Sequence, residues 1–166
     1  MLDLLVNPDV RMVTIVGPGG IGKSRLALAV TEGARERCPD GISYIDLAPL
    51  TEPSLVLPTI AKSLGIEEQT GTSVGGQLRD RLAEARMMIV LDNMEQLAEA
   101  ASEVSDLLEA TQALVLLVTS RRLLDVRGER IYTLGPLAVP ADEAVTAAVE
   151  LFLERARSIH PGYQPT

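Results

Sequence analysis

A glycine-rich octapeptide near the start of the chain joins a segment with strand character to one with helix character. Residues 12–16 form a β-branched run, and apolar residues recur at helical spacing from Lys23 to about Arg37. Glycine allows backbone dihedrals and close approaches that a Cβ atom would forbid. The sequence therefore predicts a strand, a tight loop and a helix in immediate succession. The loop, here called the P-loop, consists of Gly17, Pro18, Gly19, Gly20, Ile21, Gly22, Lys23 and Ser24.

The spacing of the P-loop, a glycine, four residues and then Gly-Lys-Ser, matches the Walker A pattern. Backbone N–H groups in such a loop form an anion-binding nest at the positive end of the following helix. The Lys23 ammonium suits the β- and γ-phosphates of a nucleotide, and the Ser24 hydroxyl suits Mg²⁺. The alternative is a glycine-rich turn before an ordinary helix, which the strand–loop–helix context disfavours. We therefore predict that the P-loop and the adjoining Arg25 bind ATP or ADP.

A carboxylate at the end of a second buried strand usually completes the Mg²⁺ site beside a P-loop. Asp92 is placed in this way, directly after the apolar run at residues 87–91. We predict that Ser24 and Asp92 hold Mg²⁺, with Asp92 acting through a water molecule. A strand-ending aspartate in a turn is the alternative.

The residues after Asp92 leave the general base for hydrolysis open. Asn93 carries an amide, which cannot take a proton from the attacking water. Glu95 is a nearby carboxylate, and two roles compete for it. It is either the catalytic base or an acid in the first turn of a helix, where the helix dipole favours negative charge.

Two hydroxyl groups and a guanidinium follow the most hydrophobic strand candidate, residues 113–118. These are Thr119, Ser120 and Arg121, and from this position they are predicted to reach a γ-phosphate. Arginine suits that task because it is always charged and binds oxyanions in a bidentate manner. The alternative is that Arg121 and Arg122 are surface charges that open a loop, and the role of Arg122 stays undecided.

Strand and helix signals alternate along the chain, which predicts an α/β fold of three layers. Five strands interleaved with helices imply a five-stranded, mostly parallel sheet covered on both faces. The expected strands are residues 12–16, 42–47, 87–91, 113–118 and 130–134. The expected helices are residues 23–37, 53–64, 73–85, 95–110 and 141–159. We assign residues 1–159 to one nucleotide-binding domain and residues 160–166 to the start of a linker.

Composition excludes several other classes of protein. With 46% hydrophobic and only 2% aromatic residues, the core must be aliphatic, as in buried parallel sheets. The net charge of −8 argues against a nucleic-acid-binding face in this segment. A single cysteine, Cys38, rules out an internal disulfide, and no apolar run is long enough to cross a membrane. We therefore expect a cytoplasmic protein.

Several motifs together resemble the nucleotide-binding core of the STAND class of signalling ATPases, which are related to the NB-ARC domains. Within that class the chain is most similar to the ATPase modules of LuxR-type and SARP/AfsR-type bacterial transcriptional regulators. The resemblance spans nearly the whole chain. The matching segments are VTIVGPGGIGKSRLAL (13–28), YIDLAPL (44–50), IVLDNMEQ (89–96), LVTSRRL (117–123), GERIYTLGPL (128–137) and residues 144–156.

The resemblance implies that the strand before Thr119 separates the Asp92 strand from the P-loop strand. It also implies that Arg121 senses the γ-phosphate in a switch between an ADP-bound resting state and an ATP-bound state. Such proteins carry a helical domain and a winged-helix domain after the core, so we interpret the chain as an isolated core. The lone His160 is expected to be a surface residue rather than the phosphate-sensing histidine of the winged-helix domain.

Three functions compete at this level. The leading hypothesis is an ATP- and ADP-binding switch that hydrolyses ATP slowly with Mg²⁺ and associates with itself when nucleotide is bound. The second is an interaction module that binds nucleotide without turnover, and Asn93 and Glu95 are the residues that divide the two. The third is a small-molecule kinase, which the arginine-free stretch at residues 67–76 disfavours because kinase lids are rich in arginine.

Overall fold

The computed structural model describes residues 1, 4–5, 7–67, 71–136 and 150. Contacts divide the chain into two units, Met1–Leu134 and Gly135–Thr166, and every strand and helix discussed below belongs to the first. The predicted helix at residues 141–159, the linker at residues 160–166 and His160 lie outside the described residues, apart from residue 150.

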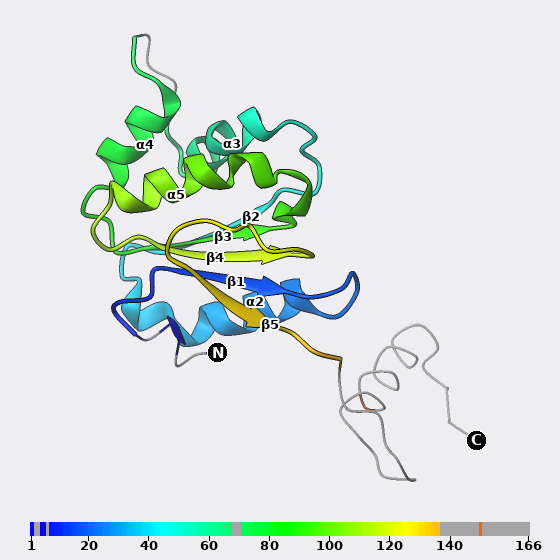
Figure 1. Cartoon of the computed structure of the whole chain (residues 1–166). Helices are drawn as coiled ribbons and strands as arrows, with labels where there is room; N and C mark the ends of the chain where they lie inside the picture. The colour runs from blue at the N-terminus through cyan, green and yellow to red at the C-terminus, as the bar shows by residue number, and fades with distance from the viewer. Residues whose placement is uncertain (2–3, 6, 68–70, 137–149, 151–166) are drawn as a thin grey trace, which may run out of the picture. The chain divides into compact units, whose positions relative to one another are not determined.

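Five parallel strands form one sheet (Figure 1). The order across the sheet is β2-β3-β4-β1-β5, so β4 lies between the P-loop strand β1 and the Asp92 strand β3. This confirms the predicted arrangement. The strands are β1 (Met12–Val16), β2 (Ile42–Asp46), β3 (Met88–Asp92), β4 (Val115–Ser120) and β5 (Glu129–Thr133).

Helices cover both faces of the sheet, so the predicted three-layer α/β fold is confirmed. Helix α2 lies on one face, and α3, α4 and α5 lie on the other (Figure 1). The helices are α2 (Lys23–Gly33), α3 (Val56–Ser63), α4 (Val74–Leu82) and α5 (Ala101–Glu109). Among the described residues, no helix has the length and apolar character needed to cross a membrane.

Alternation along the strands divides the core into two aliphatic layers. In β3, Met88 and Val90 pack on the side of α2, while Ile89 and Leu91 pack on the side of α3, α4 and α5. Successive side chains of a strand point to opposite faces, and here both faces are buried, which explains the uninterrupted apolar run. Cys38 is buried in the α2 layer, and this burial raises the pKa of its thiol.

Several predicted helices are shorter than the apolar pattern suggested. The largest difference is at residues 95–110, where two short 3-10 turns, η3 (Met94–Gln96) and η4 (Ala98–Ala100), precede α5. Their backbone N–H groups bond to the carbonyl three residues earlier, as in Leu97 N to Met94 O at 3.0 Å. Glu95 therefore lies in a 3-10 turn, and the prediction that it opens an α-helix is wrong. Similar turns, η1 (Arg35–Arg37) and η2 (Pro53–Leu55), adjoin α2 and α3.

Candidate nucleotide-binding site

The P-loop connects the carboxyl end of β1 to the amino end of α2. Gly20 and Gly22 have φ angles of 77° and 102°, which lie in the region that residues with a Cβ rarely adopt. Gly22 is the N-cap of α2 and carries no side chain, so the positive end of the helix faces the loop unobstructed. The local geometry is that of an anion-binding loop before a helix.

Gly17 is required for a different reason, the close approach of neighbouring backbone. Its N–H donates to Ser120 O at 3.3 Å, and a Cβ added to it would lie 2.9 Å from Leu134 O. The first glycine of the P-loop therefore lets β1 leave the sheet between the ends of β4 and β5.

Replacing Gly17 with alanine is expected to lower the free energy of unfolding by about 1–3 kcal/mol, because the carbonyl of Leu134 is backbone and must shift. Urea unfolding followed by circular dichroism measures this change. Gly135→Ala is the matched control, since a Cβ there meets nothing within 4 Å. Equal unfolding free energies for Gly17→Ala and the wild type would contradict the close-packing role.

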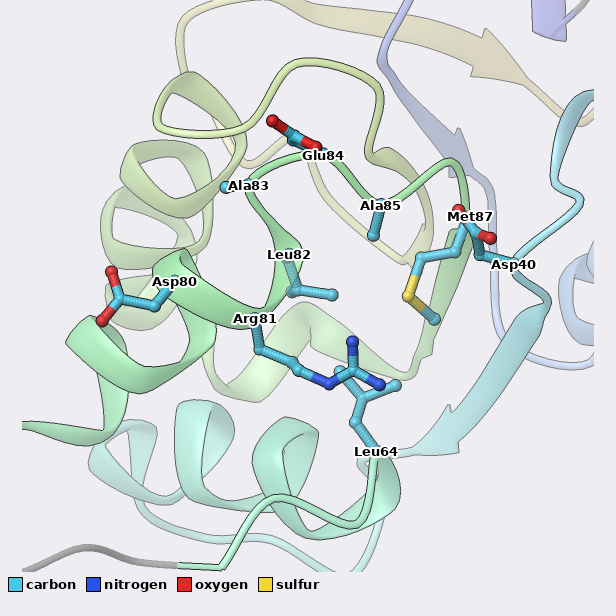
Figure 2. Close-up of a pocket in the computed structure, with 9 residues that line it drawn as sticks. All are labelled: Asp40, Leu64, Asp80, Arg81, Leu82, Ala83, Glu84, Ala85 and Met87. Carbon is cyan, nitrogen blue, oxygen red and sulfur yellow. The ribbon is translucent and has the colours of Figure 1, made fainter.

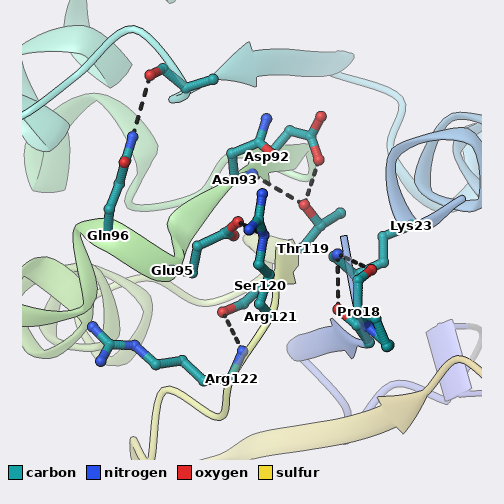
Figure 3. Close-up of polar contacts among 12 residues, drawn as sticks. Pro18, Lys23, Asp92, Asn93, Glu95, Gln96, Thr119, Ser120, Arg121 and Arg122 are labelled. Atoms are coloured by element: carbon teal, nitrogen blue, oxygen red, sulfur yellow. Dashed lines mark hydrogen bonds and ion pairs between the residues drawn. The ribbon is translucent and has the colours of Figure 1, made fainter. Parts of the chain in front are cut away.

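The Lys23 side chain lies within the P-loop and is only 8% exposed. Its Nζ donates to Gly17 O at 2.9 Å and to Pro18 O at 3.0 Å (Figure 3). Among the described residues no carboxylate forms an ion pair with Lys23. Two neutral carbonyls compensate a buried positive charge only in part. Lys23 is therefore suited to an additional anionic partner.

Three hydroxyl groups from three different elements converge on the Asp92 carboxylate, which is 4% exposed. Ser24 Oγ of α2 donates to Asp92 Oδ1 at 2.9 Å, and Thr119 Oγ1 of β4 donates to the same oxygen. Tyr44 OH of β2 donates to Asp92 Oδ2. The alternation of the strands places the side chains of Tyr44, Asp92 and Thr119 on the α2 face of the sheet, where Ser24 and the P-loop lie.

Tyr44 is a site residue that the sequence analysis missed. Burial and the hydrogen bond to Asp92 raise the pKa of its phenol well above the ordinary value. The pairing of Tyr44 with Val90 places it two residues before Asp92 on the neighbouring strand. The signal that would have found it is strand register, which a single sequence does not supply.

The two hydroxyl residues that were predicted to reach a γ-phosphate, Thr119 and Ser120, form the end of β4. Thr119 and Ser120 are both fully buried. Thr119 Oγ1 donates to Asp92 and accepts from Asn93 N at 3.0 Å, while Ser120 Oγ accepts from Arg122 N at 3.2 Å (Figure 3). Their hydrogen bonds are made within the protein, because both residues still belong to β4. These hydrogen bonds fix the chain at the end of the strand, and contact with a γ-phosphate stays a prediction.

Arg121 and Glu95, which the sequence assigned to separate roles, form an ion pair. Arg121 Nε lies 2.8 Å from Glu95 Oε1, with Arg121 65% exposed and Glu95 18% exposed. The guanidinium also borders the P-loop, because a Cβ added to Gly19 would lie 3.4 Å from Arg121 Cζ. Glu95 Oε2 is buried without a hydrogen-bond partner. The Arg121 side chain is thus open to solvent, and only one of the two carboxylate oxygens of Glu95 has a partner.

Four further polar residues, from α2 and from the segments after β3 and β4, complete the description of the site. Arg25 is exposed on the first turn of α2, and Arg122 is also exposed. Asn93 adopts a left-handed conformation with φ 69°, and its Nδ2 donates to Asp46 Oδ1 at 3.0 Å. Gln96 bonds to the carbonyls of Ala48 and Leu50, which ties the turn after β3 to the loop after β2.

A pocket of about 710 Å³ lies elsewhere, between α4 and the start of β3 (Figure 2). Its lining includes Arg81, which extends toward Leu64, and Met87, which directly precedes β3. Because all five strands are parallel, Met87 marks the amino edge of the sheet and the P-loop the carboxyl edge. Ligands of open α/β sheets bind at the carboxyl edge, so this pocket is separate from the candidate site.

The oxygen donors beside the P-loop fit Mg²⁺. Ser24 and Asp92 offer a hydroxyl and a carboxylate 2.9 Å apart, and Mg²⁺ prefers such hard ligands. Among the described residues, no group of three or more His, Cys, Asp or Glu is arranged to hold a metal by itself. Nucleotide phosphates and water usually supply the remaining ligands of Mg²⁺.

A parallel sheet with a P-loop at its carboxyl edge defines the chain as a P-loop NTPase of α/β fold. The sequence model of a family described as an AAA domain matches residues 9–126. The chain therefore belongs to this family. That assignment implies a nucleotide ligand and, typically, Mg²⁺.

Two relatives in sequence are bacterial regulators. A Mycobacterium tuberculosis protein whose name places it among HTH-type transcriptional regulators is 40% identical over 154 residues, which cover 92% of this chain. The regulatory protein AfsR of Streptomyces griseus is 35% identical over 133 residues, which cover 75% of this chain. The matched regions are only 17% and 13% of these relatives' own lengths.

Solved structures support the fold. The Cdc6 protein of Pyrobaculum aerophilum matches with a TM-score of 0.65 and 19% identity, covering 95% of this chain and 48% of that one. At this level of identity the likeness concerns the fold alone.

Proposed function

We propose that the chain is an ATP- and ADP-binding switch module of a transcription-regulating ATPase and that it hydrolyses ATP slowly. The observation that carries this proposal is the ion pair between Arg121 and Glu95 at the edge of the P-loop. The guanidinium borders the loop that would hold the phosphates and is paired with the Glu95 carboxylate.

The γ-phosphate of ATP and the Glu95 carboxylate compete for the same guanidinium. ADP lacks that phosphate and leaves the pair with Glu95 in place. ATP offers Arg121 a more highly charged, bidentate partner. A ligand shifts a conformational equilibrium only through such a difference in interaction between the two states. Arg121 thereby distinguishes ATP from ADP, and the turn that carries Glu95 receives the signal.

Mg²⁺, held by Ser24 and by Asp92 through water, would neutralise phosphate charge at the site. Lys23 binds the phosphates from within the P-loop, where its ammonium is buried beside two carbonyls. Thr119 fixes Asp92 and the backbone of Asn93 at once. Hydrogen bonds within the protein thus orient the groups that would face the nucleotide.

Replacing Arg121 with alanine is expected to reduce the ratio of ATP affinity to ADP affinity about 10-fold. A charged hydrogen bond from Arg121 to the γ-phosphate contributes about 1.5–3 kcal/mol, and breaking the pair with Glu95 offsets part of this gain. Isothermal titration with Mg²⁺-ATP and Mg²⁺-ADP measures the ratio. Arg122→Ala is the matched control, since its side chain is exposed on the next residue. A wild-type ratio in Arg121→Ala would contradict the sensing role.

A nucleotide-binding module without turnover is the second candidate, and one observation favours it. Glu95 is the proposed base, and in this structure Arg121 already occupies one of its oxygens. If the pair persists with ATP bound, Glu95 stays held by Arg121 rather than turned to the attacking water, and the Asn93 amide cannot replace it because an amide does not accept a proton.

The regulator relatives suggest the larger setting. A STAND-like, NB-ARC-related identity, a cytoplasmic location, helical and winged-helix partner domains and nucleotide-dependent self-association are parts of this proposal. DNA binding would belong to other regions of such a protein, since this segment has a net charge of −8.

A further inference from the structure

Tyr44 occupies an unusual position for a contact with the candidate Mg²⁺ site. It belongs to β2, an edge strand of the sheet, and its register partner on β3 is Val90 rather than Asp92. Two residues along a strand correspond to about 6.6 Å. The phenol ring spans this offset, whereas a serine or threonine hydroxyl at the same position would fall short.

The Tyr44 hydroxyl bonds to a different oxygen of the Asp92 carboxylate than the other two hydroxyls do. Ser24 and Thr119 both donate to Asp92 Oδ1, while Tyr44 donates to Oδ2. Oδ2 is therefore oriented by Tyr44, and a carboxylate oxygen has lone pairs for a second donor such as a metal-bound water.

We propose that Tyr44 is a positioning residue for magnesium, which holds the Asp92 carboxylate in the orientation that receives a Mg²⁺-bound water. The proposal rests on the function proposed above. Hydrogen bonds to the carboxylates and imidazoles around a metal typically change metal affinity 10- to 100-fold. Tyr44 is 39% exposed, so it reaches the site from the solvent side, while the fully buried Thr119 holds Asp92 from within the fold.

The test is the Mg²⁺ concentration that gives half-maximal ATP binding, measured by titration calorimetry. Tyr44→Phe keeps the ring and removes the hydroxyl, so we expect this concentration to rise about 10-fold, with ATP affinity in EDTA unchanged. Tyr132→Phe, on β5, is the matched control and should behave as the wild type. Asp92→Asn supplies a double-mutant cycle, in which the effect of Tyr44→Phe should vanish if Tyr44 acts through Asp92.

The outcomes separate the two proposals. Wild-type protein that binds ATP with the normal Mg²⁺ dependence, together with an unchanged midpoint in Tyr44→Phe, overturns the role of Tyr44 alone. A shift that persists undiminished in the Asp92→Asn background also overturns it, because the effect would then be structural. Wild-type protein with no Mg²⁺-dependent ATP binding overturns the proposed function as well.

Discussion

Replacing Lys23 with alanine is expected to lower the affinity for both ATP and ADP at least about 100-fold while the fold stays intact. Two charge-assisted hydrogen bonds to phosphate contribute about 1.5–3 kcal/mol each, and 100-fold corresponds to about 2.7 kcal/mol. Within the protein the ammonium bonds to two loop carbonyls, and the cost of burying its charge offsets much of their contribution, so its loss should change the free energy of unfolding by about 1 kcal/mol or less.

Titration calorimetry with each nucleotide measures the loss, and circular dichroism checks the fold. Lys62→Ala is the control, because Lys62 is the other lysine of the sequence and is exposed on α3. Equal affinities for wild type and Lys23→Ala would refute phosphate binding by the P-loop.

Replacing Glu95 with glutamine is expected to lower the rate of Mg²⁺-ATP hydrolysis at least about 100-fold, since general-base catalysis contributes about 10²- to 10⁴-fold. ATP affinity should not fall, because an amide holds Arg121 less tightly than a carboxylate does. Phosphate release under single-turnover conditions measures the rate, with the exposed Glu99→Gln as the matched control.

Two other outcomes of that experiment have distinct meanings. An unchanged rate in Glu95→Gln would show that the base assignment is wrong. No phosphate release above the buffer rate in the wild type would favour the module that binds nucleotide without turnover.

The central strands β1, β3 and β4 could be predicted well from the sequence because they are buried on both faces. Residues 12–16 and 87–91 read as unbroken apolar runs, and the structure places strands there to within one residue. The order of the strands in the sheet could not be predicted in this way. It came from the resemblance to a known class, because periodicity alone does not say which strands are neighbours.

Helix ends were predicted less well because apolar spacing does not distinguish an α-helix from successive 3-10 turns. The segment from Met94 to Ala100 buries Met94, Leu97 and Ala100 at three-residue intervals, which fits either structure. Asn93, with its left-handed φ, marks where the chain turns away from β3.

The site residues that could be predicted are those whose role follows from the residues next to them in the sequence. Lys23 and Ser24 follow the P-loop glycines, and Asp92 ends a strand. Tyr44 and the pairing of Arg121 with Glu95 depend on contacts across 48 and 26 residues, set by strand register and turn geometry. Local pattern carries no information about either contact.

The most direct test of the central claim is the position of Arg121 in a crystal structure with Mg²⁺ and a non-hydrolysable ATP analogue. We predict that residues 17–24 surround the phosphates and that the Arg121 guanidinium contacts the terminal phosphate instead of Glu95. Phosphates bound away from the P-loop, or an Arg121–Glu95 pair that remains closed with the terminal phosphate in place, would contradict the account.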